Sequence, residues 1–235
     1  MKKIKKYILG LIGGIGPEST LLYYKKLVYT IHDKADKDFF PPLVIESLDV
    51  YRVLAYCKAK DYTGLTEYVS KGIADLAAAG AQVAALTGNT PHIVFNELVN
   101  RSPIPLVSSV VVTARAVAQG GFHRPLLLGT LFTMREDFFK KACREAGIEA
   151  VVPDSDEQLR VHEFIERELE AGIVTETARN YFSELIEKMI DTRKIDTVIL
   201  GCTELPLLFE TMVSPVPVAD VTDIHVDALV KEMEE

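Results

Sequence analysis

Cys202 is the residue of this sequence best placed for proton-transfer chemistry. It follows the apolar run Thr197–Leu200 and Gly201, at a point where a strand is expected to give way to a helix. A thiol at a helix N-terminus lies in a field that favours the thiolate, so this position predicts a lowered pKa and an acid/base thiol. The other cysteines, Cys57 and Cys143, fall inside helical patterns and are interpreted as small buried apolar residues.

A similar segment occurs in the first half of the chain. Residues 83–90 read VAALTGNT and resemble residues 197–204, which read TVILGCTE, so Gly88 stands where the second half has Cys202. Thr87 lies one residue before Gly88 and is expected to point to the other side of an extended strand. Residues near these segments are interpreted as substrate-binding, most of them as hydrogen-bond donors to a carboxylate: Asn89, Thr90, Thr130, Thr133, Thr203 and Glu204.

Glycines open the first predicted helix, at residues 13–16. A glycine such as Gly14 lets a ligand approach the backbone, and a helix N-terminus attracts an anion. A dinucleotide fingerprint fits poorly, because the pattern is GxGxxS and no acidic residue ends the second strand. A tight turn without a ligand is the structural alternative. Arg52 and Arg160 are candidates to bind a substrate carboxylate, and each is equally well interpreted as a surface residue.

Metal and other catalytic motifs are missing from the sequence. The five histidines show no HxH or HExxH spacing, the three cysteines form no CxxC pair, and no GxSxG elbow or P-loop occurs. No metal and no cofactor are therefore expected.

The elements that position these residues alternate between strand and helix. Apolar runs predict strands at 7–12, 43–47, 82–86, 104–107, 126–128, 149–152, 197–200 and 216–218. Helical periodicity predicts helices at 17–32, 62–80, 91–100, 109–119, 134–147, 156–171, 175–193, 205–210 and 223–233. Such alternation is typical of the α/β class with parallel sheets.

The internal repeat predicts two pseudo-symmetric lobes, each an open, mostly parallel sheet flanked by helices. We expect residues 1–108 plus 224–235 to form the first lobe and residues 109–223 the second. Ligands of open α/β sheets bind outside the carboxyl ends of the strands. One active site between the lobes is therefore expected, built from the loops that follow the strands.

Composition limits the class of protein. The 235 residues are 48% hydrophobic and 26% charged, which is typical of a soluble globular protein. The net charge of −8 argues against nucleic acid or an anionic membrane as a partner. The lysine-rich start precedes an apolar run that glycines interrupt early, so we expect no signal peptide and a cytoplasmic location.

Taken together, these motifs resemble the aspartate/glutamate racemase superfamily, and specifically its aspartate racemase branch. The resemblance covers nearly the whole chain. Its motifs are GLIGGIGPEST at residues 10–20, Ser-Leu-Asp at 47–49, NTPH at 89–92, GTLFTM at 129–134, the acidic pair 156–157 and GCTEL at 201–205. The resemblance implies two α/β lobes, a homodimer, an amino-acid or dicarboxylate substrate, and no pyridoxal phosphate or metal.

The chemistry implied by the resemblance is proton removal at Cα by one thiol and return of a proton by a second. Cys202 matches the second thiol of the family, and Asn89, Thr90, Thr130 and Thr203 match residues that hold the α-carboxylate. The sequence departs from the family at Gly88, where the first thiol should directly precede the Asn-Thr pair. Thr87, Thr90 or a water is then left as the substitute for that thiol.

Two alternatives follow from the missing thiol. The arylmalonate decarboxylase branch resembles this arrangement, since it protonates a carbanion with a single thiol; one-sided proton exchange has the same logic. An inactive homologue that only binds an amino acid is the third interpretation. We expect Cys202→Ala to abolish proton exchange, and Gly88→Cys to create or raise racemase activity.

Overall fold

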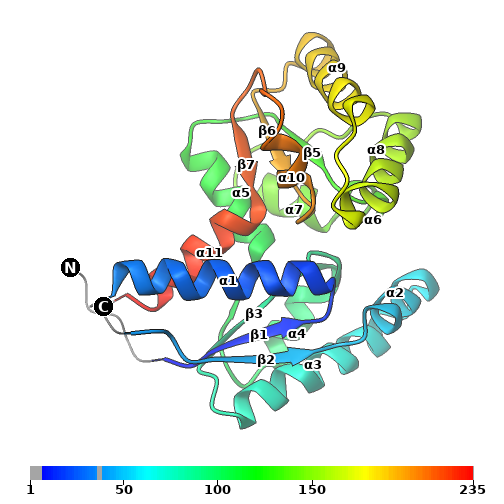
Figure 1. The fold of residues 1–235 in the computed structure, drawn as a ribbon. Coiled ribbons are helices and arrows are strands. Elements are labelled where there is room, and N and C mark those ends of the chain that lie inside the picture. Colours follow the sequence, from blue (N-terminus) through cyan, green and yellow to red (C-terminus); the bar gives the residue numbers. More distant parts are fainter. Residues whose placement is uncertain (1–6, 36–38, 235) are drawn as a thin grey trace. The chain divides into compact units, whose positions relative to one another are not determined.

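The computed structural model describes residues 7–35 and 39–234, and the chain divides into two compact units (Figure 1). The first unit comprises Met1–Ser109 and His225–Glu235, and the second comprises Val110–Ile224. Each contains one parallel sheet flanked by helices, which confirms the predicted α/β class.

The first unit contains a four-stranded sheet in the order β2-β1-β3-β4, with all neighbours parallel. Helices cover both faces of such a sheet, so β1 is buried along its whole length. Leu9 and Leu11 pack against α1 and α11, whereas Ile12 faces Gly72 of α3. The elements are β1 (Leu9–Gly13), α1 (Pro17–Lys34), β2 (Leu43–Ser47), α2 (Val50–Ala59), α3 (Tyr62–Ala78), β3 (Val83–Leu86), η1 (Thr90–Val94), α4 (Phe95–Arg101), β4 (Leu106–Val107) and, from His225 onward, α11 (Val221–Glu232).

A buried histidine joins the last helix to the first unit. His225 in α11 is fully buried, and its Nε2–H donates to the carbonyl oxygen of Val107 at 3.1 Å. Its Nδ1 therefore accepts the hydroxyl proton of Tyr23 at 2.9 Å. This pair of bonds links α11 with β4 and α1, so residues far apart in sequence complete one core.

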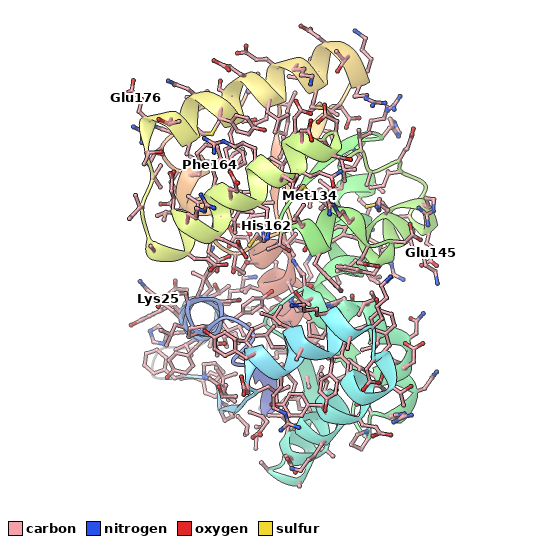
Figure 2. All side chains as sticks on the ribbon, turned by 90° about the vertical axis from the view of Figure 1, so that its right-hand side faces the viewer. Lys25, Met134, Glu145, His162, Phe164 and Glu176 are labelled. Carbon is pink, nitrogen blue, oxygen red and sulfur yellow. The ribbon has the colours of Figure 1, made fainter. Side chains whose placement is uncertain are left out.

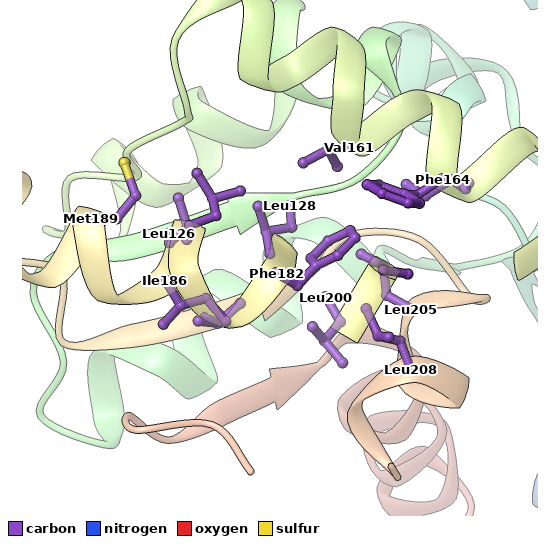
Figure 3. Packing of buried hydrophobic residues seen from close by; sticks show 14 of the residues in the cluster. Leu126, Leu128, Val161, Phe164, Phe182, Ile186, Met189, Leu200, Leu205 and Leu208 are labelled. Atoms are coloured by element: carbon purple, nitrogen blue, oxygen red, sulfur yellow. The ribbon is translucent and has the colours of Figure 1, made fainter. Parts of the chain in front are cut away.

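The second unit contains a three-stranded parallel sheet in the order β5-β6-β7. Phe182 of α9 and Phe164 of α8 pack with Leu128 and Leu200 on one face of this sheet (Figure 3). Phe164 lies inside the unit, whereas the exposed Glu176 lies at its periphery (Figure 2). The elements are α5 (Ser109–Gln119), β5 (Pro125–Leu128), α6 (Leu131–Arg135), α7 (Phe138–Glu145), α8 (Ser155–Arg167), η2 (Leu169–Ala171), α9 (Glu176–Arg193), β6 (Thr197–Leu200), α10 (Leu205–Phe209) and β7 (Val218–Asp220).

Prolines explain two errors in the predicted strands. The strand expected at 149–152 is absent, and only Val151 forms a bridge, to Leu126. Pro153 follows directly and has no N–H with which to continue the ladder. The strand expected at 216–218 begins instead at Val218, because Pro217 contributes only its carbonyl oxygen, which accepts from Val198 N at 3.0 Å.

Several helices also differ from the prediction. The helix expected at 134–147 is two helices, because Glu136 leaves the helical conformation and Lys140 Nζ donates to the terminal carbonyl oxygens of Met134 and Arg135. The helix expected at 156–171 ends at Arg167 and continues as the separate turn η2. The one expected at 91–100 begins as the 3₁₀ turn η1. Helix α2 was not among the predicted elements.

In the part of the chain that the structure describes, none of the helices is long and apolar enough to cross a bilayer.

Candidate active site

Cys202 lies in the turn between β6 and α10 and donates a hydrogen bond to a carboxylate. Its Sγ–H points to Oε2 of Glu204 at 2.8 Å, and Thr203 Oγ1 donates to Oε1 of the same carboxylate at 2.9 Å. Both oxygens of Glu204 are thus engaged by the two residues that precede it. The arrangement holds the thiol beside a proton acceptor.

The environment of Cys202 raises the pKa of its thiol well above the ordinary value. Burial is the largest cause, followed by the negative charge of Glu204 and by its hydrogen bond to the thiol; Glu170 adds to the effect. The predicted lowering of this pKa is therefore wrong. Helix α10 spans only Leu205–Phe209, so its field is outweighed by burial and by the adjacent carboxylate.

Glu170 brings a second negative charge to this end of the second unit. It belongs to η2, whose Leu169 packs in the same core as Leu205 of α10. Partial burial, and next the charge of Glu204, raise the pKa of the Glu170 carboxyl. The Cys202 thiol therefore lies near two carboxyl groups, those of Glu204 and Glu170.

Thr130 and Thr133 lie close to the Cys202 turn. Thr130 caps α6, since its Oγ1 accepts from the backbone N–H of Thr133 at 3.4 Å, and the two hydroxyl oxygens are 3.3 Å apart. A Cβ placed on Gly129 would lie 3.1 Å from both Thr133 and the carbonyl oxygen of Gly201. The turn after β5 therefore packs against the turn after β6, and the predicted residues of the second unit converge at one sheet edge.

Thr87 lies in the first unit with its hydroxyl group buried. Its Oγ1 donates to the carbonyl oxygen of Ile12 at 3.2 Å and lies 3.3 Å from Thr20 Oγ1. Its own carbonyl oxygen accepts from Ser19 Oγ. These contacts make Thr87 part of the packing between β3 and α1 and give its hydroxyl a structural role.

The glycine loop after β1 folds against its own unit. Gly14 has φ 74° and Gly16 has φ 100°, values that favour glycine. A Cβ on Gly14 would lie 2.0 Å from the carbonyl oxygen of Leu48. The close approach of the segment after β2 therefore requires a glycine at position 14, independently of any ligand.

Asn89 belongs to a buried hydrogen-bond chain. Ser109 Oγ–H donates to Asn89 Oδ1 at 2.7 Å, which leaves the hydroxyl oxygen to accept from Nε2–H of His92 at 3.2 Å. The His92 ring stacks on Phe95 with 5.0 Å between centroids. Burial lowers the pKa of His92 to about 4, so the ring is neutral at neutral pH. Thr90, which follows Asn89, opens η1.

Ser109 was missing from the predicted site. It comes two residues after the end of β4, so the position of Ser109 just beyond a strand end was the signal that could have identified it.

Arg52 and Arg160 are engaged at the surface. The Arg160 guanidinium contacts Glu163 at 3.0 Å and lies 4.4 Å from the ring centroid of Phe164. Arg52 lies 4.2 Å above the ring of Tyr68. Both side chains are exposed.

Within residues 7–35 and 39–234, no group of three or more His, Cys, Asp or Glu side chains is arranged to hold a metal ion. The expectation that the segments around Gly88 and Cys202 form one active site stays a prediction.

The fold and the residues at the strand ends define an α/β protein with an acid-flanked thiol in one unit and a glycine at the matching position of the other. Residues 12–229 match the family described as Asp/Glu/Hydantoin racemase, and the chain belongs to this family. It is similar to the structure of an aspartate racemase homologue from Pyrococcus horikoshii OT3, at 35% identity, a TM-score of 0.86 and full coverage of both chains.

Two further relatives are racemases by name. The aspartate racemase of Picrophilus torridus shares 25% identity with a TM-score of 0.70, over 97% of this chain and 94% of that structure. The broad specificity amino-acid racemase RacX of Bacillus subtilis is 21% identical over 216 residues, covering 91% of this chain and 92% of the relative. Membership of this family supports amino-acid racemase activity and an amino-acid substrate.

Proposed function

We propose that this protein is a cofactor-independent amino-acid racemase that moves the Cα proton with Cys202 as its acid/base group. The observation that carries the proposal is the hydrogen bond from Cys202 Sγ–H to Glu204. A thiol with a raised pKa keeps its proton and cannot act as a base until another group accepts that proton. Oε2 of Glu204 lies 2.8 Å from Cys202 Sγ and is the acceptor.

The proton steps follow from this pair. Glu204 accepts the Cys202 proton, and the thiolate then removes the Cα proton of the amino acid, which leaves a carbanion and restores the thiol. For racemisation, a water on the opposite face then protonates Cα. The proton held by Glu204 neutralises the hydroxide that this water leaves, so that the thiol, the carboxylate and the water are all restored. Glu204, predicted from the sequence to bind substrate, is thus proposed as the proton acceptor for the thiol.

The carbanion must be stabilised by donors to the α-carboxylate. We propose Asn89 and Thr90 from the first unit, and Thr130 and Thr203 from the second. The Asn89 side chain is oriented by Ser109, and Thr130 is fixed as the cap of α6. Donors held in place by such contacts cost little reorganisation during the reaction.

Gly88 supports a second candidate reaction. Position 88 carries no side chain, and the neighbouring Thr87 hydroxyl is buried against Ile12. A site with one thiol exchanges the Cα proton with solvent on one face and retains configuration. The same logic applies to a decarboxylase that protonates its carbanion with Cys202.

The class of amino acid is also a proposal. An aspartate or glutamate substrate needs a partner for its second carboxylate, and Glu170 and Glu204 make the surroundings of Cys202 negative. Arg52 and Arg160 are the proposed cationic candidates. A homodimer without pyridoxal phosphate remains the expectation that the family resemblance implies, and a cytoplasmic location remains the expectation from the N-terminal sequence.

The proposal is tested by proton NMR of the purified protein in D₂O with L- and D-aspartate and L- and D-glutamate, followed by chiral analysis. Neutral and basic amino acids extend the panel. Loss of the Cα signal with racemisation supports the racemase, and loss with retained configuration supports one-sided exchange. Binding without exchange, unchanged in Cys202→Ala, would contradict both reactions.

A further inference from the structure

Space, and not backbone conformation, keeps a glycine at position 88. Gly88 is not among the glycines with positive φ in the described part of the chain. A Cβ built on it would lie 2.8 Å from Cγ2 of Ile15 and 3.0 Å from the carbonyl oxygen of Ile15. A side chain at position 88 therefore requires the Ile15 side chain to shift, and its Cβ comes into tight contact with the Ile15 carbonyl oxygen.

The loop that carries Ile15 is anchored on both sides. The Gly14 N–H donates to Thr20 Oγ1 at 2.9 Å, and this hydroxyl donates to the carbonyl oxygen of Gly16 at 3.0 Å. Ser19 Oγ–H donates to the carbonyl oxygen of Thr87, the residue directly before Gly88. The loop and the strand end beneath it are tied together, so these contacts hold the main chain of Ile15 beside Gly88.

Ile15 is also largely buried, with 9% of its surface exposed. Its side chain has no group that can donate or accept a proton. Where the family resemblance places the first thiol, this chain therefore has an apolar side chain packed over a bare backbone.

We propose that Ile15 determines which proton chemistry position 88 can support: together with Gly88 it closes this side of the site to a second acid/base side chain. The inference rests on the proposed function, since it concerns transfer of the Cα proton. It predicts that no protein side chain at position 88 takes part in proton transfer, so that any transfer on this face passes through water. It also predicts that Gly88→Cys is insufficient to create a second thiol in working position unless Ile15 is shortened.

The packing part of the proposal is tested by unfolding in urea. Gly88→Ala is expected to raise the equilibrium constant for unfolding by about tenfold or more, the usual range for an overpacked side chain. In Ile15→Ala/Gly88→Ala the added methyl group has room, so the two changes are expected to be strongly non-additive. Additive effects of the two substitutions would overturn the proposed contact, whatever the protein catalyses.

The chemical part is tested by racemisation, on an amino acid whose Cα proton the wild type exchanges. Ile15→Ala/Gly88→Cys is expected to racemise it at least about tenfold faster than Gly88→Cys, the range of a positioned general acid/base being about 10²–10⁴-fold. Ile15→Ala/Gly88→Ala is the matched control without a thiol and is expected to gain nothing. Equal racemisation by the single and double cysteine variants, or no gain in either, would overturn the role of Ile15.

Failure of the proposed function gives a different result. In that case no amino acid loses its Cα proton with the wild type, while the unfolding experiment still shows coupling between positions 15 and 88. Coupling without exchange therefore rejects the reaction, and exchange without coupling rejects the role of Ile15.

Discussion

The turns after β3 and β6 begin with the same kind of backbone hydrogen bond, but the glycine and the residue with a side chain stand in opposite order. In the first unit Thr87 N–H donates to the carbonyl oxygen of Ile12 at 2.9 Å; in the second, Gly201 N–H donates to that of Leu128 at 2.7 Å. The first unit then has a side chain followed by a bare glycine. The second unit has a bare glycine followed by Cys202.

The surroundings explain this exchange of positions. A Cβ on Gly201 would lie 2.8 Å from the carbonyl oxygen of Leu128, whereas Thr87 uses the equivalent carbonyl of Ile12 as a hydrogen-bond acceptor. At the next position, Cys202 lies beside the carboxylate of Glu204, whereas Gly88 lies against Ile15. Matched turns of a repeated fold thus differ in chemistry according to what covers each position.

The largest expected effect is the loss of the thiol itself. Cys202→Ala is expected to lower the rate of Cα exchange by about 10²–10⁴-fold, because the general acid/base is removed. The measurement is loss of the Cα proton signal in D₂O. Cys143→Ala is the matched control, since this thiol is buried in the core and burial raises its pKa to about 12. Full exchange activity in Cys202→Ala would place the chemistry elsewhere.

The two units are also expected to differ in their response to acid. Burial lowers the pKa of His92 to about 4 and that of His225 to about 3, and both residues belong to the first unit. The unfolded chain binds these protons near pH 6.5 while the folded unit does not, so stability is lost as the pH falls from 6.5 toward 4. The loss is expected to be about 2–3 kcal/mol for each histidine by pH 4.5.

Urea unfolding at pH 7 and pH 4.5 checks this prediction. His225→Gln is expected to reduce the difference between the two pH values, and the exposed His123→Gln serves as its control. An unchanged pH dependence in His225→Gln would show that the acid sensitivity has another source.

The contrast between the turns can be sharpened at Glu204. Glu204→Gln removes the negative charge that raises the pKa of Cys202 and replaces the carboxylate acceptor with a neutral amide, so this pKa is expected to fall. Alkylation of the thiol should then shift to lower pH, while Cα exchange slows because the proton acceptor is lost. The measurement is the pH profile of iodoacetamide labelling at Cys202, with Cys202→Ala as the background. An unshifted profile would contradict the role of Glu204.

The sequence predicted the positions of most elements and of the turns that carry Gly88 and Cys202. Apolar runs, and the resemblance of residues 83–90 to residues 197–204, can be recognised in the sequence itself. It could not predict the raised pKa of Cys202, which depends first on burial in the folded unit, then on the side chain of Glu204, with Glu170 adding to the effect. The packing of Ile15 on Gly88 was equally hidden, since it joins two loops through space. Helix α2 was missed although Asp49 caps it through the N–H of Tyr51.

Ser109 was also missing from the predicted site, and its substitution is expected to have the smallest effect. Ser109→Ala removes the donor that fixes Asn89 and is expected to lower kcat/KM by roughly five- to tenfold, the worth of one buried hydrogen bond of about 1 kcal/mol. Because the donors to the α-carboxylate stabilise the charge that develops in the carbanion, the loss should fall on kcat as well as on KM. Ser109→Thr keeps the hydroxyl group and should recover part of the activity. Steady-state kinetics of both variants decide the point: an unchanged kcat/KM in Ser109→Ala would separate the Ser109–Asn89 bond from substrate binding and leave it a packing contact of the first unit.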